Sequence, residues 1–230
     1  RQRQMCIRDS IWGTSPGILT NTAEDDRGAG WVDDTHFVTL TGLMPNTTYY
    51  FKIESDGIYY DDGGSPYQVT TGPIPNDIPT PYSAYGYVNK SDGVTPAEGT
   101  IVYAYVEKGG STSEQISVLV DSDGLFILDL GNLRDSDGQV FDYSGGTLWL
   151  RFQGAGDGVY PNGGYTAKAL LGSGTAQFLG YFILNSLFYE PPATSWYPDD
   201  PTDTANGNIN MDSMNVQIDS GALFLYMNVT

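Results

Sequence analysis

The fold is decided by the stretch 36-HFVTLTGLMPNTTYYFKIES-55. In its first half, Val38 and Leu40 alternate with other side chains and fall on one face of an extended chain. After a Pro-Asn turn signal the alternation resumes, and the apolar side chains from Tyr49 to Ile53 again share one face. We therefore predict two strands joined by a corner at which the chain crosses from one sheet to another.

The rest of the chain has the composition and the pattern of an all-β protein. Of 230 residues, 17 are Tyr and 29 are Gly, which suits short strands joined by tight turns. Strand-like runs without a helical period recur at residues 84–88, 100–106, 115–120, 125–130, 147–152 and 176–184. They predict an all-β fold of tandem Ig-like β-sandwiches.

Residues 11–72 resemble the fibronectin type III family. The stretch LMPNTTYYFKI is similar to the signature that joins strands E and F in that family, with Leu43, Pro45 and Tyr49 in its signature positions. Trp12 stands where the family has the core Trp of strand B. The resemblance implies a sandwich that lacks its first strand and in which the Tyr49 hydroxyl bonds backbone upstream. It implies a scaffold for binding rather than for catalysis.

A linker and a second module follow. Four prolines within residues 73–81 predict an extended, semi-rigid linker, since proline cannot pair in the centre of a sheet. Residues 82–187 contain GYVNKSDG, PAEGTIV and DSDGLFI, which resemble the carboxypeptidase-regulatory-like family of Ig-type modules. This resemblance implies a second, non-catalytic sandwich. Beyond about Gly131 the chain departs from the family pattern.

The two ends of the chain differ from its middle. Residues 1–10, RQRQMCIRDS, resemble translated sequencing-adapter DNA, which predicts an artefact or a disordered tail on a metagenomic fragment without its signal peptide. Residues 188–230 begin with a Pro-rich joint and end with two strand-like runs, which predict a hairpin. The hairpin could dock on residues 82–187, begin a further β module, or complete the sheet of a neighbouring subunit in a filament.

The charge and the cysteine content limit which classes of partner and which cellular location we expect for this chain. With 10 basic and 28 acidic side chains, the net charge of −18 excludes a nucleic-acid surface. No run of about 20 apolar residues is present, so we expect no direct membrane insertion. The one cysteine leaves no internal disulfide. Sandwich modules without disulfides favour a secreted or cell-surface bacterial protein, hence an extracellular location.

The sequence offers little for catalysis, and we predict that the chain is not an enzyme. A Ser-His-acid site would need His36, the one histidine, which we expect to be solvated at a strand start. Neighbouring residues of an extended chain point apart, so adjacent carboxylates are expected to solvate turns. The adjacent pairs are Asp25-Asp26, Asp33-Asp34, Asp61-Asp62 and Asp199-Asp200.

Calcium is the best candidate among cofactors, with no other cofactor expected. Asp121 and Asp123, and again Asp135 and Asp137, stand in Asp-Ser-Asp-Gly stretches that resemble the first half of a calcium loop. Neither stretch has the Glu that completes such a loop. The alternative is a β-turn in which Asp accepts from backbone N–H groups and Gly adopts a positive φ.

Aromatic residues suggest polysaccharide as a partner. Trp31 and Trp196 lie in predicted loops and could stack on sugar rings, whereas Trp149 lies between core-like Leu residues. Packing within the core or the linkers is the alternative for all three.

Two functions of different classes therefore stay open. One is a structural or adhesive array of modules that contacts other modules or subunits of a surface protein. The other is the accessory, polysaccharide-binding portion of a secreted hydrolase. An exposed strip of aromatic side chains on one module would favour the second function.

Overall fold

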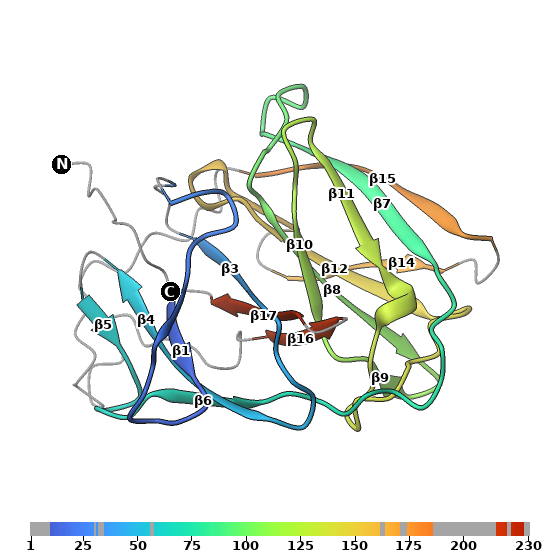
Figure 1. The fold of residues 1–230 in the computed structure, drawn as a ribbon. Coiled ribbons are helices and arrows are strands. Elements are labelled where there is room, and N and C mark those ends of the chain that lie inside the picture. Colours follow the sequence, from blue (N-terminus) through green and yellow to red (C-terminus); the bar gives the residue numbers. More distant parts are fainter. Residues whose placement is uncertain are drawn as a thin grey trace. The chain divides into compact units, whose positions relative to one another are not determined.

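The computed structural model describes residues 10–29, 31, 35–55, 58–161, 164–170, 174–185, 215–219 and 222–227. It consists of strands and two short 3-10 turns, η1 (Leu130–Asn132) and η2 (Ala155–Asp157), which confirms the all-β prediction (Figure 1). None of the described residues forms a helix long and apolar enough to cross a membrane. The chain divides into two compact units. Unit 1 comprises Arg1–Gly72 and Pro191–Thr230, and unit 2 comprises Pro73–Glu190.

Unit 1 contains two sheets. The five-stranded sheet has the order β2-β1-β4-β5, with β6 also paired to β4. Its strands are β1 (Ser10–Gly13), β2 (Asn21–Ala23), β4 (Thr48–Ser55), β5 (Ile58–Tyr60) and β6 (Tyr67–Thr70). The second sheet has the order β16-β17-β3. Its strands are β3 (His36–Thr41), β16 (Asn215–Asp219) and β17 (Ala222–Met227).

The predicted corner lies between β3 and β4. These consecutive strands belong to different sheets, as the alternation of their apolar residues predicts. Val38 and Leu40 from β3 are buried in the same core as Phe51 from β4. The Tyr49 hydroxyl accepts a hydrogen bond from the backbone N–H of Met44 at 2.9 Å, the upstream contact that the family resemblance implies.

Other residues of the family-like signature lie around this core. Leu43 is buried and Pro45 is exposed. Trp12 on β1 is half-buried and contacts Tyr49 edge to face, with 5.6 Å between the ring centroids. The two rings thus pack against each other across the neighbouring strands β1 and β4.

The C-terminal hairpin belongs to unit 1. β16 pairs with β17, and β17 pairs antiparallel with β3 over six residues, from Ala222 opposite Thr41 to Met227 opposite His36. The hairpin was predicted, and the strand with which it pairs in the structure is β3 of unit 1. Unit 1 therefore extends beyond residues 11–72.

Unit 2 is built from two further sheets. The larger sheet has the order β10-β8-β12-β13, with β14 paired to β12 and β9 paired to β8. Its strands are β8 (Ile101–Lys108), β9 (Ser111–Thr112), β10 (Ile116–Leu119), β12 (Thr147–Gln153), β13 (Val159–Tyr160) and β14 (Thr166–Ala169). The smaller sheet has the order β11-β7-β15 and contains β7 (Ser83–Asn89), β11 (Leu125–Asp129) and β15 (Ala176–Ile183). β7 and β15 run parallel, whereas β7 and β11 run antiparallel.

Both sheets of unit 2 contribute to one apolar core. Ala84 and Val88 from β7 meet Leu148, Leu150 and other residues from the larger sheet. All six strand-like runs of the sequence are strands here. The short strands β9, β13 and β14 were not predicted, because two to four residues are too few to show an alternation.

Candidate functional site

The smaller sheet of unit 2 carries aromatic side chains on the side that points away from the core. Along β7, buried residues alternate with outward ones, so that Tyr85 and Tyr87 both face outward. Phe178 and Tyr181 face outward from β15. The aromatic face, as we call this surface, consists of Tyr85, Tyr87, Leu125, Ile127, Phe178, Tyr181 and Ile183.

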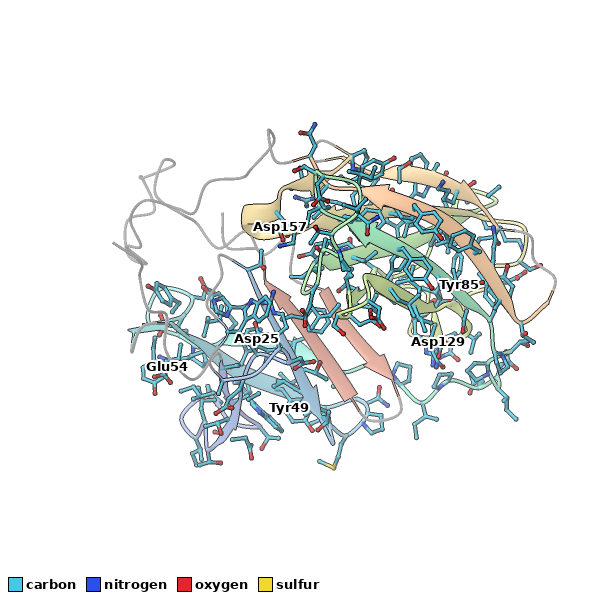
Figure 2. All side chains as sticks on the ribbon, turned by 90° about the horizontal axis from the view of Figure 1, so that it is seen from above. Asp25, Tyr49, Glu54, Tyr85, Asp129 and Asp157 are labelled. Carbon is cyan, nitrogen blue, oxygen red and sulfur yellow. The ribbon has the colours of Figure 1, made fainter. Side chains whose placement is uncertain are left out.

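The strand register sets these residues side by side. Residues opposite each other in neighbouring strands lie within contact distance, so the register defines rows across the sheet. One row is Leu125, Tyr87 and Tyr181, and the next is Ile127, Tyr85 and Phe178. Figure 2 labels Tyr85 on β7 and Asp129 at the end of β11.

A bulge in β15 allows both of its rings to face outward. Phe178 and Tyr181 are three residues apart and would point to opposite sides of a regular strand. The register with β7 shifts between them, at Gly180, whose φ is +119°. On β7, a Cβ at position 86 would lie 2.8 Å from the Gly180 carbonyl oxygen, so Gly86 provides the space for the bulge.

The four rings contact one another across and along the strands. Tyr87 and Tyr181 are nearly parallel, with 5.4 Å between centroids and 19° between planes. Tyr85 and Phe178 lie 5.4 Å apart, tilted by 40°. Phe178 also meets the edge of Tyr181 at 5.6 Å. The rings therefore form one continuous cluster, and each pair adds about 0.5–1.5 kcal/mol to the sheet.

This cluster is open to solvent and nearly free of charge. Tyr181 is 70% exposed, Phe178 46% and Ile127 53%. The strands β7, β11 and β15 contain no Lys or Arg, and Asp129 is their one charged residue. A contiguous apolar surface on so acidic a chain is an exception to the usual distribution of residues, and such surfaces mark binding sites.

Of the two tryptophans predicted to stack on sugars, the one that the structure describes lies outside the aromatic face. Trp196 is outside the described residues. Trp31 is half-buried, and the Arg27 guanidinium lies over its ring at 4.7 Å from the centroid. The ring therefore supports Arg27 in unit 1.

Arg27 and Asp25 form a buried ion pair. Both Asp25 oxygens accept from the guanidinium, Oδ1 from Nε at 2.8 Å and Oδ2 from Nη2 at 2.6 Å. The Arg27 side chain is 5% exposed and that of Asp25 is 2% exposed. Thr35 accepts from the guanidinium through its hydroxyl and its carbonyl oxygen. A solvated carboxylate was predicted at Asp25, and that prediction is wrong because this bidentate pair compensates the charge on burial.

His36 also differs from its prediction. Its side chain is 12% exposed rather than solvated, and Nδ1 lies 3.5 Å from Oδ2 of Asp25. Burial alone would raise the pKa of Asp25, but hydrogen bonds from Arg27, from His36 and from the Phe37 N–H outweigh burial and hold this pKa well below its usual range. These hydrogen bonds keep the Asp25 carboxylate in its charged form. Two of its partners, His36 and Phe37, belong to β3, so the carboxylate also bonds the edge of that strand.

Two of the aspartates considered for calcium, Asp121 and Asp135, each close a turn. Oδ1 of Asp121 accepts from the N–H groups of Asp123 and Leu125, both at 2.9 Å. Asp135 accepts in the same way from Asp137 and Gln139, at 3.0 and 2.9 Å. The glycines that follow, Gly124 and Gly138, have φ of +80° and +74°. The turn interpretation thus describes both loops. In the part of the chain that the structure describes, no three His, Cys, Asp or Glu residues gather as metal ligands would.

The sequence contains a partial signal for the aromatic face. The run Tyr85-Gly-Tyr87 shows that two rings share one side of a strand, and the run from Phe178 to Tyr181 is rich in aromatic residues. The parallel pairing of β7 with β15 and the bulge at Gly180 join these runs, and neither follows from a period of two. Comparison with known proteins adds no family, because no family model and no curated protein matches the chain.

Proposed function

We propose that this chain is a non-catalytic, polysaccharide-binding portion of a secreted or cell-surface bacterial protein, with the aromatic face of unit 2 as its binding surface. The observation that carries the proposal is the cluster of four outward-facing rings on β7 and β15, of which Phe178 and Tyr181 are exposed and Tyr85 and Tyr87 are half-buried. This is the kind of aromatic strip that favours polysaccharide binding over a purely structural role.

The shape of the surface points to a polymer rather than to a small molecule. Small ligands are bound in concave pockets that enclose most of their surface. The aromatic face is the outer surface of a sheet, and its rings extend over two rows along β7 and β15. Such a surface covers one side of an extended chain, so that several weak contacts add up along the polymer.

The charge of the surface points to a neutral polymer. Tyr and Phe rings offer apolar faces to the C–H groups of a sugar, and the Tyr hydroxyls exchange hydrogen bonds with its hydroxyl groups. Because the three strands hold no basic residue and the whole chain carries a net charge of −18, anionic polymers would be repelled. We therefore choose a neutral polysaccharide as the ligand.

A structural or adhesive array of modules is the second candidate function. It is favoured by the division of the chain into two all-β units with a Pro-rich segment at the start of unit 2. The two functions differ in whether the chain binds polysaccharide through the aromatic face, which can be measured. A structural array needs no exposed rings.

The test is retention of the purified chain on insoluble neutral polysaccharides. Cellulose, chitin, insoluble xylan and granular starch are the probes, and alginate is the anionic comparison. We expect retention on at least one neutral polymer and none on alginate. The double variant Phe178→Ala/Tyr181→Ala should bind at least tenfold more weakly, since removal of a binding ring costs about 1–2 kcal/mol.

Tyr59→Ala is the matched control, because Tyr59 is 44% exposed but lies on β5 of unit 1. It should bind like the unaltered chain. Equal retention of the double variant and the control would overturn the aromatic face as the site. No retention on any neutral polymer would overturn the proposed function and leave the array.

A further inference from the structure

The two edges of β3 in unit 1 have different partners. On one edge, backbone groups of Phe37 and Thr39 are bonded by neighbours in the sequence. Asp25 Oδ2 accepts from the Phe37 N–H at 3.0 Å, and Asp26 Oδ1 accepts from the Thr39 N–H at 2.9 Å. The Asp26 N–H donates to the Phe37 carbonyl at 2.8 Å. This edge is therefore closed by the segment that carries the buried ion pair.

The other edge of β3 pairs with β17. Because successive backbone groups of a strand point to opposite edges, the groups of Val38 and Leu40 are the ones that face β17. The register supports this arrangement, with Leu225 opposite Val38 and Leu223 opposite Leu40. Of the two edges of β3, one is thus closed by residues 25 and 26 and the other accepts a strand.

Unit 1 needs the strand that fills this edge. Val38 and Leu40 are each 1% exposed and form part of the core. In the described part of unit 1, β3 has no ladder partner except β17, and a single strand does not make a stable sheet. The hairpin β16–β17 completes the second sheet.

The hairpin and its acceptor are far apart in the sequence. Thr41 pairs with Ala222, and the whole of unit 2 lies between them. Ile183 ends β15 and Asn215 begins β16, so 31 residues connect β15 to the hairpin. At up to about 3.3–3.6 Å per residue, this connection reaches roughly 100 Å, which is far enough for unit 1 of a second copy.

We propose that the hairpin β16–β17 is exchanged between copies of this chain, so that β17 of one copy completes β3 of another in the register seen within one copy. Because the hairpin and its own β3 belong to one chain, pairing within one copy is favoured by an effective concentration in the millimolar range. The single-copy form therefore dominates in dilute solution, and exchanged dimers form when the local concentration of copies approaches that range. The proposal is independent of polysaccharide binding.

Two complementary variants test the exchange in the full chain. Leu223→Pro/Leu225→Pro prevents β17 from pairing but leaves β3 intact, whereas Val38→Pro/Leu40→Pro removes the accepting edge but leaves the hairpin. We expect each variant alone to stay monomeric in light scattering after gel filtration. An equimolar mixture should form a complex of one copy of each, and no complex in the mixture would overturn the proposal.

A peptide provides a second measurement that does not depend on folding of the Val38→Pro/Leu40→Pro variant. A fluorescent peptide of residues 212–230 should bind the Leu223→Pro/Leu225→Pro chain in a ratio of one to one. It should bind the unaltered chain at least tenfold more weakly, because the hairpin already occupies β3 there. A peptide of the same composition in scrambled order is the control. Binding of the scrambled peptide with equal affinity, or no binding of the matching peptide, would contradict the exchange.

Discussion

The two units depart from the usual distribution of residues in opposite ways. Unit 1 buries charge, with Asp25 and Arg27 paired beneath the surface and His36 beside them. Unit 2 exposes aromatic rings, with Tyr181 and Phe178 on the outside of a sheet whose inner side already contributes to an apolar core. The buried charges organise an edge of the fold, whereas the rings stabilise their sheet through contacts with one another and leave apolar surface open to solvent. The buried ion pair therefore has its partners within the fold, whereas the exposed rings keep surface that a ligand could cover, which is why we propose them as the binding surface.

The largest effect is expected at the buried ion pair. Asp25→Asn removes the negative charge opposite Arg27, and loss of one partner of a buried pair costs about 3–5 kcal/mol. The folded pKa of Asp25 lies below the unfolded value of about 3.9, so the carboxylate stabilises unit 1 above that pH. Its contribution is lost as the pH falls through the folded pKa. The measurement is urea unfolding between pH 2 and 7. The difference in the free energy of unfolding between Asp25→Asn and the unaltered chain should be largest near pH 6 and should shrink towards pH 2.

Asp123→Asn is the control for that experiment, because Asp123 is exposed and in unit 2. It should change the free energy of unfolding by less than about 0.5 kcal/mol. A constant difference for Asp25→Asn across the whole pH range would contradict the assigned role of its charge.

The next effect tests how unit 2 displays its rings. Gly86→Ala would place a Cβ 2.8 Å from the Gly180 carbonyl oxygen and 2.9 Å from the Phe126 ring. Such overpacking costs about 1–3 kcal/mol, and it should also weaken polysaccharide binding by displacing the bulge. Gly156→Ala is the control, since a Cβ at Gly156 has no neighbour within 4 Å. Thermal unfolding and retention on the bound polymer measure both effects, and equal behaviour of the two variants would refute the role of Gly86.

A smaller effect separates a turn from a calcium site. Asp121→Ala loses two hydrogen bonds to backbone N–H groups and should lower the stability of unit 2 by about 1 kcal/mol, whereas Asp121→Asn keeps an acceptor and should lose less. Because this role needs no metal, addition of 5 mM CaCl2 should leave the unfolding temperature of the unaltered chain unchanged. A rise that disappears in Asp121→Ala would restore the calcium hypothesis.

The smallest effect contrasts an exposed ion pair with the buried one. Lys108 and Asp142 in unit 2 are 2.5 Å apart, with side chains 34% and 74% exposed. Lys108→Met should therefore change the free energy of unfolding by less than about 1 kcal/mol, and 0.5 M NaCl should abolish the difference. A salt-resistant loss comparable to that of Asp25→Asn would show that exposure does not distinguish the two pairs.

Local patterns in the sequence predict much of the fold. The alternation around the corner predicts that Val38 and Leu40 are buried in one sheet and Phe51 in the other. The runs that became β7 and β15 were identified as strands for the same reason. Local patterns do not show which strands pair with each other. The ladder of β17 with β3, for example, joins residues that are separated in the sequence by the whole of unit 2.

The candidate site was less predictable than the fold. Trp31 was selected because it lies in a predicted loop, but a loop assignment says nothing of the Arg27 side chain that covers its ring. The exposed rings come from strands, where alternation alone divides aromatic residues equally between the core and solvent. The bulge at Gly180 decides which side Tyr181 takes, and a bulge depends on the neighbouring strand.

The parallel pairing of β7 with β15 has a mechanical consequence. Among the described strands of unit 2, β7 is the first and β15 is the last, so tension applied at the two ends of unit 2 pulls the start of β7 and the end of β15 in opposite directions. Because the two strands are parallel, their paired residues bear this load in shear and at the same time, rather than one pair after another. The aromatic face lies across these two strands, so a ligand held there is attached directly to the strands that bear the load.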